Sequence, residues 1–260
     1  MNYRKVTVFF CFWLWSSSGF CARPPELPLR VVTENFPPYN YLTAEGELAG
    51  VMNHIIQELL TRLDSKQPIE VLPWARAYQT ALTEPNTLIY SIVKTPVRED
   101  KFHWLISFLS LDINVYSLPG TYKGKIKDLK EVQQQSIGIM RASSHENYIR
   151  QHFRRDKQHV TTNISYLHLY QMLQLKRLDL IVAPSRLIRY LNQQQQTPVE
   201  KRPEAIFKLP FPFQKKLYIA LSKKTPDHRV EKVKQTLIAM EDDGTIAKII
   251  KKHHPPAVSH

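Results

Sequence analysis

Cysteine is almost absent from this chain. Its 260 residues include only Cys11 and Cys21, and both lie near the amino terminus. Once a leader containing them is removed, no cysteine pair remains, so we expect neither an intramolecular disulfide nor a cysteine-based metal site. Glycine is also scarce, with 7 residues against 18 prolines, which excludes a glycine-rich low-complexity protein. Stability must therefore come from an ordinary hydrophobic core.

Long apolar runs are missing too, apart from a short one at residues 6–15. At about 10 residues this run is too short to span a bilayer, which takes about 20. Arg4 and Lys5 precede it, and the small residues Ser16 to Gly19 follow, an order typical of a secretory signal peptide. We predict a leader over residues 1–22. An uncleaved anchor and lipidation at Cys21 remain alternatives, although bulky Phe20 disfavours lipidation.

Acidic residues are too few to balance the basic ones. Lys and Arg number 36 and Asp and Glu 23, which gives a net charge of +13. Such a charge suits nucleic acid, an anionic membrane surface or an acidic ligand. The basic residues are dispersed and form no nucleic-acid recognition module, so we expect no nucleic-acid partner. The chain also contains no HExxH, GxSxG, Walker A or GxGxxG motif, so we expect neither an enzyme nor a cofactor.

Short apolar strands alternate with amphipathic helices from residue 29 onward. In residues 51–63, for example, apolar side chains recur at helical spacing. The pattern predicts strands at residues 29–33, 69–72, 88–93, 137–140, 160–162, 178–183 and 217–221. It predicts helices at residues 51–63, 74–82, 144–153, 166–175, 185–191, 227–240 and 245–252. This alternation indicates an α/β protein with largely parallel sheets covered by helices on both faces.

Four landmarks along the chain make a family resemblance specific. They are LRVVT followed by FPPY and GELAG, the turn TPVRE after a strand, IGI followed later by KRLDL, and the ending MEDDGTIAKI. Over residues 29–252 the chain resembles the bacterial extracellular solute-binding proteins of family 3. The resemblance implies a periplasmic protein with a two-lobed, type II periplasmic-binding-protein fold, and we expect it to be a monomer. Two crossing hinge strands, at residues 113–118 and 206–212, would join residues 29–113 plus 210–260 to residues 114–209.

The resemblance also implies ligand-binding residues in the first lobe. Arg98, in the TPVRE turn, corresponds to an arginine that clamps a ligand carboxylate through its fork of donors. Phe36 stands where the family places a ring over the ligand, and Ser91 where it places a small hydroxyl. Trp74 and Arg76 in PWARAY would face the same cleft. A surface arginine paired with a neighbouring acid is the alternative for Arg98.

In the second lobe, Arg141 precedes a predicted helix and Ser144 lies at its start. Ser143 or Ser144 suits the cap position, and the free N–H groups of a helix start favour an anion. Capping alone is the alternative interpretation. The candidate ligand set is therefore Arg98, Phe36, Ser91, Trp74, Arg76, Arg141 and Ser144, with no metal site.

One departure from the family pattern bears on the ligand. Where amino-acid receptors carry a carboxylate for the ligand ammonium, this chain has Pro184, and Val93 replaces a common hydroxyl. Additional positive charge near the predicted site comes from Arg76, Lys94, Arg141 and His145. We therefore favour a carboxylate-bearing or anionic small molecule over a zwitterionic α-amino acid.

The expected function is capture of this solute for ABC-type import, with a permease as partner. The alternative is a periplasmic sensor or accessory protein that docks on a signalling membrane protein. Some relatives on this scaffold are dehydratases that use a cleft carboxylate, a role open here to Glu34. Fold alone does not decide chemistry, and we expect binding rather than catalysis.

Overall fold

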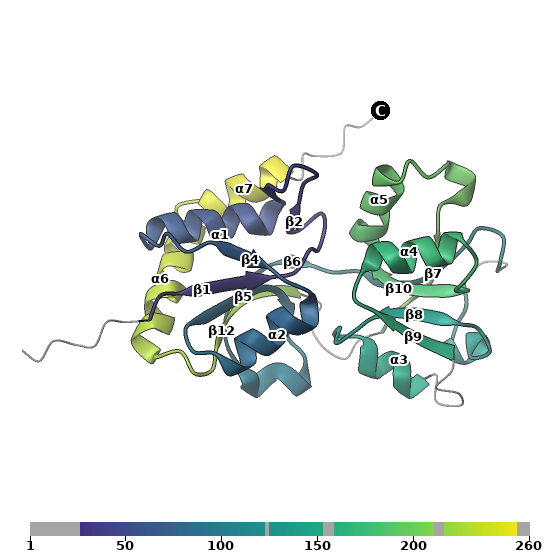
Figure 1. The fold of residues 1–260 in the computed structure, drawn as a ribbon, viewed down its shortest axis with the longest axis horizontal. Coiled ribbons are helices and arrows are strands. Elements are labelled where there is room, and N and C mark those ends of the chain that lie inside the picture. Colours follow the sequence, from purple (N-terminus) through teal and green to yellow (C-terminus); the bar gives the residue numbers. More distant parts are fainter. Residues whose placement is uncertain (1–26, 123–124, 153–158, 211–215, 254–260) are drawn as a thin grey trace, which may run out of the picture.

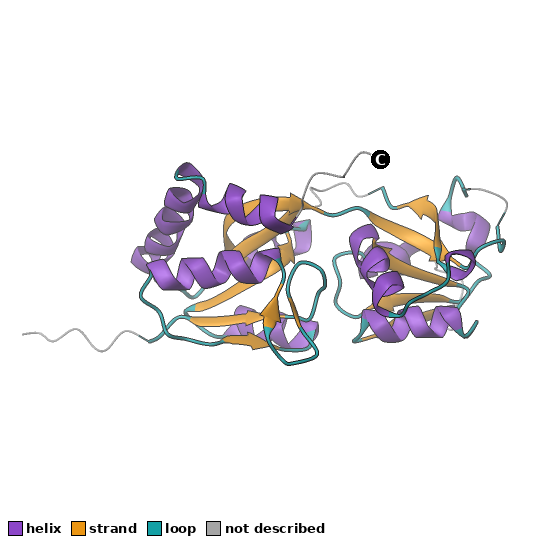
Figure 2. Cartoon of the chain, turned by 90° about the horizontal axis from the view of Figure 1, so that it is seen from above, coloured by secondary structure: helices purple, strands orange, loops and turns teal. Residues whose placement is uncertain are grey.

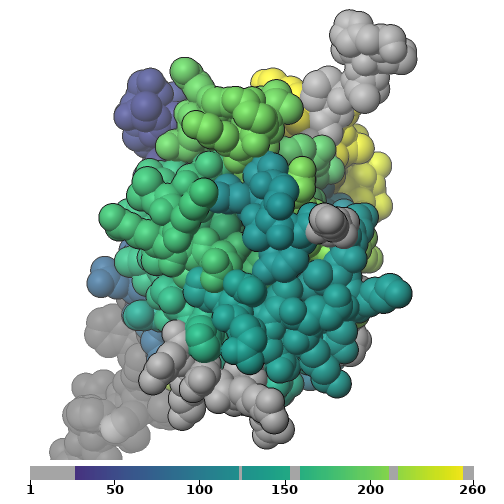
Figure 3. All heavy atoms as spheres, turned by 90° about the vertical axis from the view of Figure 1, so that its right-hand side faces the viewer, coloured from purple at the N-terminus to yellow at the C-terminus, as the bar shows by residue number. Residues whose placement is uncertain are grey.

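The computed structural model describes residues 27–122, 125–152, 159–210 and 216–253. The predicted leader over residues 1–22 lies outside these ranges. Two five-stranded sheets, each with helices on both faces, stand end to end as two lobes (Figure 1). From the end of the second lobe, its teal and green residues fill most of the view, and first-lobe residues show only at the rim (Figure 3). The two-lobed α/β architecture is as predicted.

The first-lobe sheet has the strand order β4-β1-β5-β12-β6. Its strands are β1 (Arg30–Thr33), β4 (Ile69–Val71), β5 (Thr87–Val93), β6 (Phe102–Ser110) and β12 (Lys216–Ser222). The helices of this lobe are α1 (Val51–Arg62), α2 (Trp74–Thr83), α6 (Asp227–Asp242) and α7 (Thr245–His253). A short hairpin of β2 (Tyr41–Leu42) and β3 (Leu48–Ala49) precedes α1. A 3-10 helix over Pro96–Lys101 follows β5.

The second-lobe sheet has the order β11-β7-β10-β8-β9. Its strands are β7 (Ile113–Ser117), β8 (Ile137–Met140), β9 (Val160–Asn163), β10 (Leu180–Pro184) and β11 (Glu204–Lys208). Its helices are α3 (Glu146–His152), α4 (Tyr166–Gln174) and α5 (Ser185–Gln194). Short 3-10 helices cover Leu129–Val132 and Val199–Lys201. Figure 2 shows both lobes with their strands as an inner layer between helices.

Strand direction corrects one expectation, since the sheets are mixed rather than largely parallel. In the first lobe β1 pairs in parallel with β4 and β5, but β12 is antiparallel to both β5 and β6. In the second lobe β7 is antiparallel to β10 and β11. These antiparallel strands flank the crossings between lobes. Consecutive strands pair in parallel when a helix connects them across the sheet. A strand that enters the sheet from the other lobe has no such connection, so it can pair in the antiparallel direction.

Burial on both faces of the sheets follows from the apolar runs in the strands. Val31 and Val32 of β1 point to opposite faces, and both are fully buried. Val31 packs with the apolar face of α1, whereas Val32 packs with Trp74 and Ala77 of α2. The carboxyl-terminal helices α6 and α7 lie on the α1 side (Figure 1). The last strand and helices therefore complete the first lobe.

The chain passes between the sheets twice. The first crossing lies at Leu111 and Asp112, because the predicted crossing at residues 113–118 is largely β7 itself. The second connects β11 to β12, and its residues 211–215 lie outside the described ranges. β6 was not predicted as a strand. It brings the chain to the cleft, and this places the first crossing earlier than expected. Within the described ranges, no helix has the length and apolar character needed to cross a membrane.

Gly50 fixes the loop that leads from β1 to α1. Its φ is 103°, and a Cβ there would lie 2.4 Å from the carbonyl oxygen of Tyr39. We expect Gly50→Ala to lower the free energy of unfolding by about 1 kcal/mol or more beyond the loss for Gly46→Ala. Gly46 is the matched control, because it has a positive φ (85°) but open space around it. Urea denaturation measures both losses, and equal losses would contradict the steric argument.

Candidate functional site

A cavity lies between the two lobes at the level of the first crossing, and we call it the inner cavity. The described residues that line it come from both lobes. They are Glu34, Phe36, Trp74, Ser91, Val93, Arg98, Leu111, Ile113, Met140, Ser143, Ser144, His145, Tyr166 and Pro184. Glu34 and Arg98 are the only residues in this lining set with a formal charge. The inner cavity therefore combines apolar side chains with polar ones, and one basic and one acidic residue are among them.

The structure brings together most of the predicted binding residues. Five of them line the inner cavity, namely Arg98, Phe36, Ser91, Trp74 and Ser144. Arg76 and Arg141 are exposed and are not part of its lining. Trp74 and Tyr78 are four residues apart and share a face of α2, whereas Arg76 lies between them on the opposite side.

Arg98 is buried, with 6% of its surface exposed. The Thr95-Pro96 start of the 3-10 helix turns the chain so that the guanidinium reaches back to β5. Nη1 donates to the carbonyl oxygen of Val93 at 3.1 Å, and Nη2 donates to that of Ala142, in the other lobe, at 2.8 Å. Burial lowers the pKa of this guanidinium. These two bonds use two of the five N–H donors of an arginine.

Two aromatic rings from α2 flank the Arg98 guanidinium. Its Cζ lies 5.3 Å from the ring centre of Trp74 and 4.9 Å from that of Tyr78. Both distances are within the range of cation–π attraction. The Trp74 indole also donates to the Ala142 carbonyl oxygen at 2.8 Å. Ala142 therefore accepts hydrogen bonds from two first-lobe side chains. We call this arrangement the Ala142 latch. The sequence analysis did not identify Tyr78 as a candidate site residue. Its position four residues after Trp74 in a predicted helix would have placed both rings on the same helix face.

Ser91 reaches the inner cavity because β5 is irregular there. Its φ is 58°, and the pairing of β12 with β5 skips it, since Tyr218 opposes Ile92 and Ile219 opposes Tyr90. A bulge of this kind changes the direction of a side chain. The Ser91 hydroxyl donates to the side-chain oxygen of Asn40. Asn40 is fully buried and was not predicted.

Aromatic rings also meet across the cleft. Phe36 stacks on Tyr166 of α4, with ring centres 6.0 Å apart. Nearer the surface, Tyr41 of β2 lies 5.3 Å from Tyr190 of α5 by the same measure. Together with the Ala142 latch, these pairs hold the lobes in contact over the inner cavity. Tyr166 was not among the predicted residues, and burial raises the pKa of its hydroxyl well above the ordinary value.

Glu34 directly follows β1 and is buried in the inner cavity. Its Oε2 atom has no hydrogen-bond partner among the described residues. Burial raises the pKa of the Glu34 carboxyl to about 8, although Arg98 opposes the rise. The group is therefore mostly protonated at neutral pH. A buried polar atom without a protein partner is costly, so a water or a ligand atom is expected to satisfy it.

His145 is likewise buried, and it has two side-chain atoms without a hydrogen-bond partner among the described residues where Glu34 has one. It is 1% exposed, and neither ring nitrogen has a hydrogen-bond partner among the described residues. Burial lowers the pKa of His145 to about 3, with Arg98 adding to the effect. The ring is therefore neutral, and its expected positive charge is absent. The nearby Ser143 hydroxyl is also buried and unpartnered within the described part of the chain.

The remaining expected positive charges also lie elsewhere. Lys94 pairs with Glu99 at 2.9 Å, and Arg76 and Arg141 face solvent. The predicted helix cap is corrected as well. α3 begins at Glu146, so neither Ser143 nor Ser144 directly precedes it. Pro184 does lie at the inner cavity, where it ends β10 and supplies no carboxylate.

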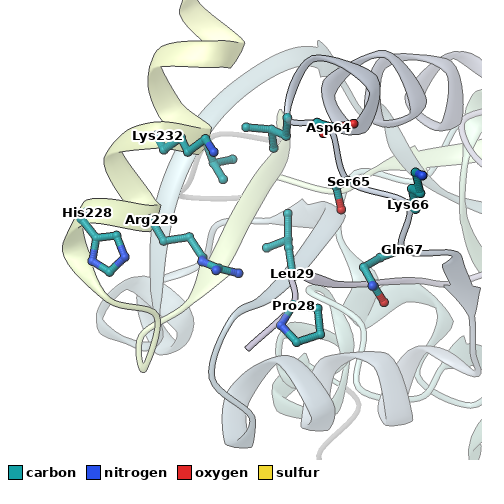
Figure 4. A pocket seen from close by; sticks show the side chains of 11 residues that line it. Pro28, Leu29, Asp64, Ser65, Lys66, Gln67, His228, Arg229 and Lys232 are labelled. Atoms are coloured by element: carbon teal, nitrogen blue, oxygen red, sulfur yellow. The ribbon is translucent and has the colours of Figure 1, made fainter. Parts of the chain in front are cut away.

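A different cavity, of about 280 Å³, lies at the outer end of the first lobe (Figure 4). It is formed between the chain that leads into β1, the loop after α1, and α6, from which His228, Arg229 and Lys232 reach it. Every residue that lines it belongs to the first lobe, so lobe closure cannot enclose a ligand there. We also find no group of three or more His, Cys, Asp or Glu within the described ranges that could hold a metal ion.

Two α/β lobes, two crossings and a cavity between the lobes match the fold of type II periplasmic binding proteins. The chain belongs to the bacterial extracellular solute-binding proteins, family 3, whose model matches residues 29–256. No curated protein sequence matches it.

Solved structures of the same fold share little sequence with the chain. An ancestral arginine-binding protein bound to arginine has a TM-score of 0.74 and 18% identity, covering 86% of this chain and 97% of its own. An amino acid ABC transporter substrate-binding protein from Streptococcus pneumoniae, bound to L-arginine, has a TM-score of 0.73 and 13% identity. The match covers 89% of this chain and 96% of that protein. A histidine kinase sensor domain similar to periplasmic binding proteins has a TM-score of 0.74 and 11% identity. The match covers 87% of this chain and 96% of that domain.

Proposed function

We propose that this protein is a monomeric periplasmic receptor that binds a small, carboxylate-bearing solute between its lobes for ABC-type import. Family membership supports solute binding, and the structural relatives support an amino-acid-like ligand. The leader over residues 1–22 and the lobe boundaries at residues 29–113 plus 210–260 and 114–209 are part of this proposal. We propose binding without chemical conversion of the solute.

One observation carries the proposal: the inner cavity contains Arg98 together with buried polar atoms that lack partners. Arg98 would receive the ligand carboxylate, because its planar fork matches two carboxylate oxygens. The Ser143 hydroxyl and the neutral His145 ring add hydrogen-bonding groups from the second lobe. Since these groups come from both lobes, a ligand that satisfies them favours the closed arrangement.

Glu34 takes the place of the carboxylate that is missing at Pro184. Its unpartnered oxygen can accept a hydrogen bond from an ammonium, amide or hydroxyl group of the ligand. The solute would then carry a carboxylate for Arg98 and a donor for Glu34. Such a ligand is amino-acid-like without using the usual second-lobe carboxylate.

A screen of the mature protein by thermal shift tests this proposal. The panel contains amino acids, dicarboxylates, short peptides and polyamines. A ligand at 100 times its Kd adds about 2.7 kcal/mol to the free energy of unfolding. We expect stabilisation by a carboxylate-bearing compound, and a lower radius of gyration by small-angle scattering as the lobes close. Stabilisation by polyamines alone would contradict a carboxylate ligand.

A sensory role is the second candidate. The likeness to a histidine kinase sensor domain favours it, because that domain shares this fold. The receptor would then dock on a signalling membrane protein rather than a permease. Cellular uptake of the identified solute distinguishes the two roles.

A further inference from the structure

A larger depression adjoins the inner cavity on its outer side, and we call it the outer groove. Nineteen described residues line it, mainly from the loop after β1, the start of α2, the start of α4, and α5. Four of them, Glu34, Trp74, Met140 and Tyr166, also line the inner cavity. The two spaces are therefore adjacent, and side chains from both lobes border both of them.

The two spaces differ greatly in size. The inner cavity measures about 40 Å³ and the outer groove about 460 Å³. At roughly 10–15 Å³ for each water, the inner cavity has room for about three waters. That is the size of a carboxylate group and is too small for a molecule with a long side chain. Most of a larger ligand would have to lie in the outer groove.

The chemistry of the outer groove also differs from that of the inner cavity. Most of its lining residues are apolar or aromatic, among them Leu72, Leu187 and Tyr190. No lysine, arginine or aspartate is found in its described lining, although the chain carries 36 Lys and Arg residues. Leu42 and Ile164 line the groove from opposite lobes and are 40% and 55% exposed. We call these two residues the rim pair.

We propose that the outer groove is a second subsite for the same ligand, which is a carboxylic acid with a sizeable apolar body. The proposal rests on the solute-binding function above. The carboxylate would enter the inner cavity beside Arg98, and the apolar body would lie in the outer groove between α5 and the loop after β1. Burial of exposed apolar surface on both partners, including the rim pair, would favour this arrangement. A ligand of this class differs from a free amino acid enclosed entirely by the lobes.

A homologous series of probes tests the proposal. Acetate, phenylacetate, phenylbutyrate and phenylhexanoate share one carboxylate and differ in the reach of the apolar body. Titration calorimetry should give a Kd that falls by about tenfold or more from phenylacetate to phenylhexanoate. Phenylhexylamine, which lacks the carboxylate, should bind far more weakly than phenylhexanoate. Equal affinity along the series, or no measurable binding by any member, would overturn the outer groove as a subsite.

Variants at the rim pair separate the groove from the rest of the surface. Leu42→Ser with Ile164→Ser should weaken phenylhexanoate binding by about tenfold. The matched control is Leu175→Ser with Val199→Ser, which changes two side chains that are 64% and 72% exposed and lie outside the groove. We expect wild-type affinity from the control, and wild-type unfolding temperatures from both variants because all four side chains are already exposed.

The outcomes also distinguish this proposal from the proposed function. If a small amino acid binds tightly, depends on Arg98 and ignores the rim-pair substitutions, the receptor function stands and the groove proposal fails. If no compound with a carboxylate binds by any route, both fail. If light scattering finds a wild-type dimer that the rim-pair substitutions dissociate, the groove belongs to a second copy of the chain, and the proposal is again overturned.

Discussion

Arg98→Lys should weaken ligand binding by about 10- to 150-fold, a loss of roughly 1.5–3 kcal/mol. Lysine keeps the positive charge but presents a single ammonium in place of a planar fork. It would leave the ligand with one point contact, and it would also lose the donors now directed at Val93 and Ala142. Titration calorimetry with the ligand from the screen measures the change. Arg76→Lys is the control, because Arg76 is exposed and lies outside the inner cavity.

A second variant separates carboxylate binding from lobe closure. Trp74→Phe removes the indole donor to the Ala142 carbonyl oxygen but keeps a ring beside Arg98. It therefore weakens the Ala142 latch and spares the guanidinium. We expect Trp74→Phe to have the smaller effect on affinity. If it matched Arg98→Lys, the main role of Arg98 would be closure of the lobes. If Arg98→Lys bound like the wild type, the carboxylate assignment would be wrong.

The ligand-free protein should lose stability between about pH 6.5 and pH 8, and Glu34→Gln should remove most of this loss. The pKa of Glu34 rises from 4.5 to about 8 on burial in the folded chain. Above pH 4.5 the unfolded chain releases a proton that the folded chain keeps, so this contribution to stability falls as pH rises to 8. At about 1.36 kcal/mol for each pH unit, the change from pH 6.5 to 8 is about 2 kcal/mol.

The titration of His145 sets pH 6.5 as the lower limit of this pH range. Its pKa falls from 6.5 to about 3 in the folded chain, so its contribution to stability grows as pH rises from 3 to 6.5. From pH 4.5 to 6.5 the contributions of Glu34 and His145 oppose each other. Above pH 6.5, of these two contributions to stability, only that of Glu34 changes with pH.

Urea denaturation at a series of pH values measures both proteins. Glu34→Gln is nearly isosteric and carries no titrating proton, so its stability should be flatter between pH 6.5 and 8. All other titrating groups are common to the two proteins, and only the difference between the curves is interpreted. Parallel curves would show that Glu34 titrates as an exposed acid and would remove the argument for a buried ligand partner.

Much of the local structure was predictable because it depends on short-range patterns. The helix predicted at residues 51–63 is α1 at Val51–Arg62, and the strand predicted at residues 137–140 is β8. Apolar side chains at helical spacing, or in short continuous runs, suffice for such assignments. β6 was missed because Phe102–Ser110 is mostly half-buried and mixes polar with aromatic residues. Its partner β12 lies more than 100 positions further along the chain.

The sequence by itself determined the succession of strands and helices, the family landmarks, and the candidacy of Arg98, Phe36, Ser91, Trp74 and Ser144. It determined these because periodicity and motifs are local properties of a chain. Only the tertiary structure decided that Arg76 and Arg141 face solvent and that His145 is buried and neutral. Only the tertiary structure placed Glu34 and Tyr166, 132 positions apart, at one cavity. Burial and the resulting pKa values depend on which lobes and faces meet, and that follows from long-range packing.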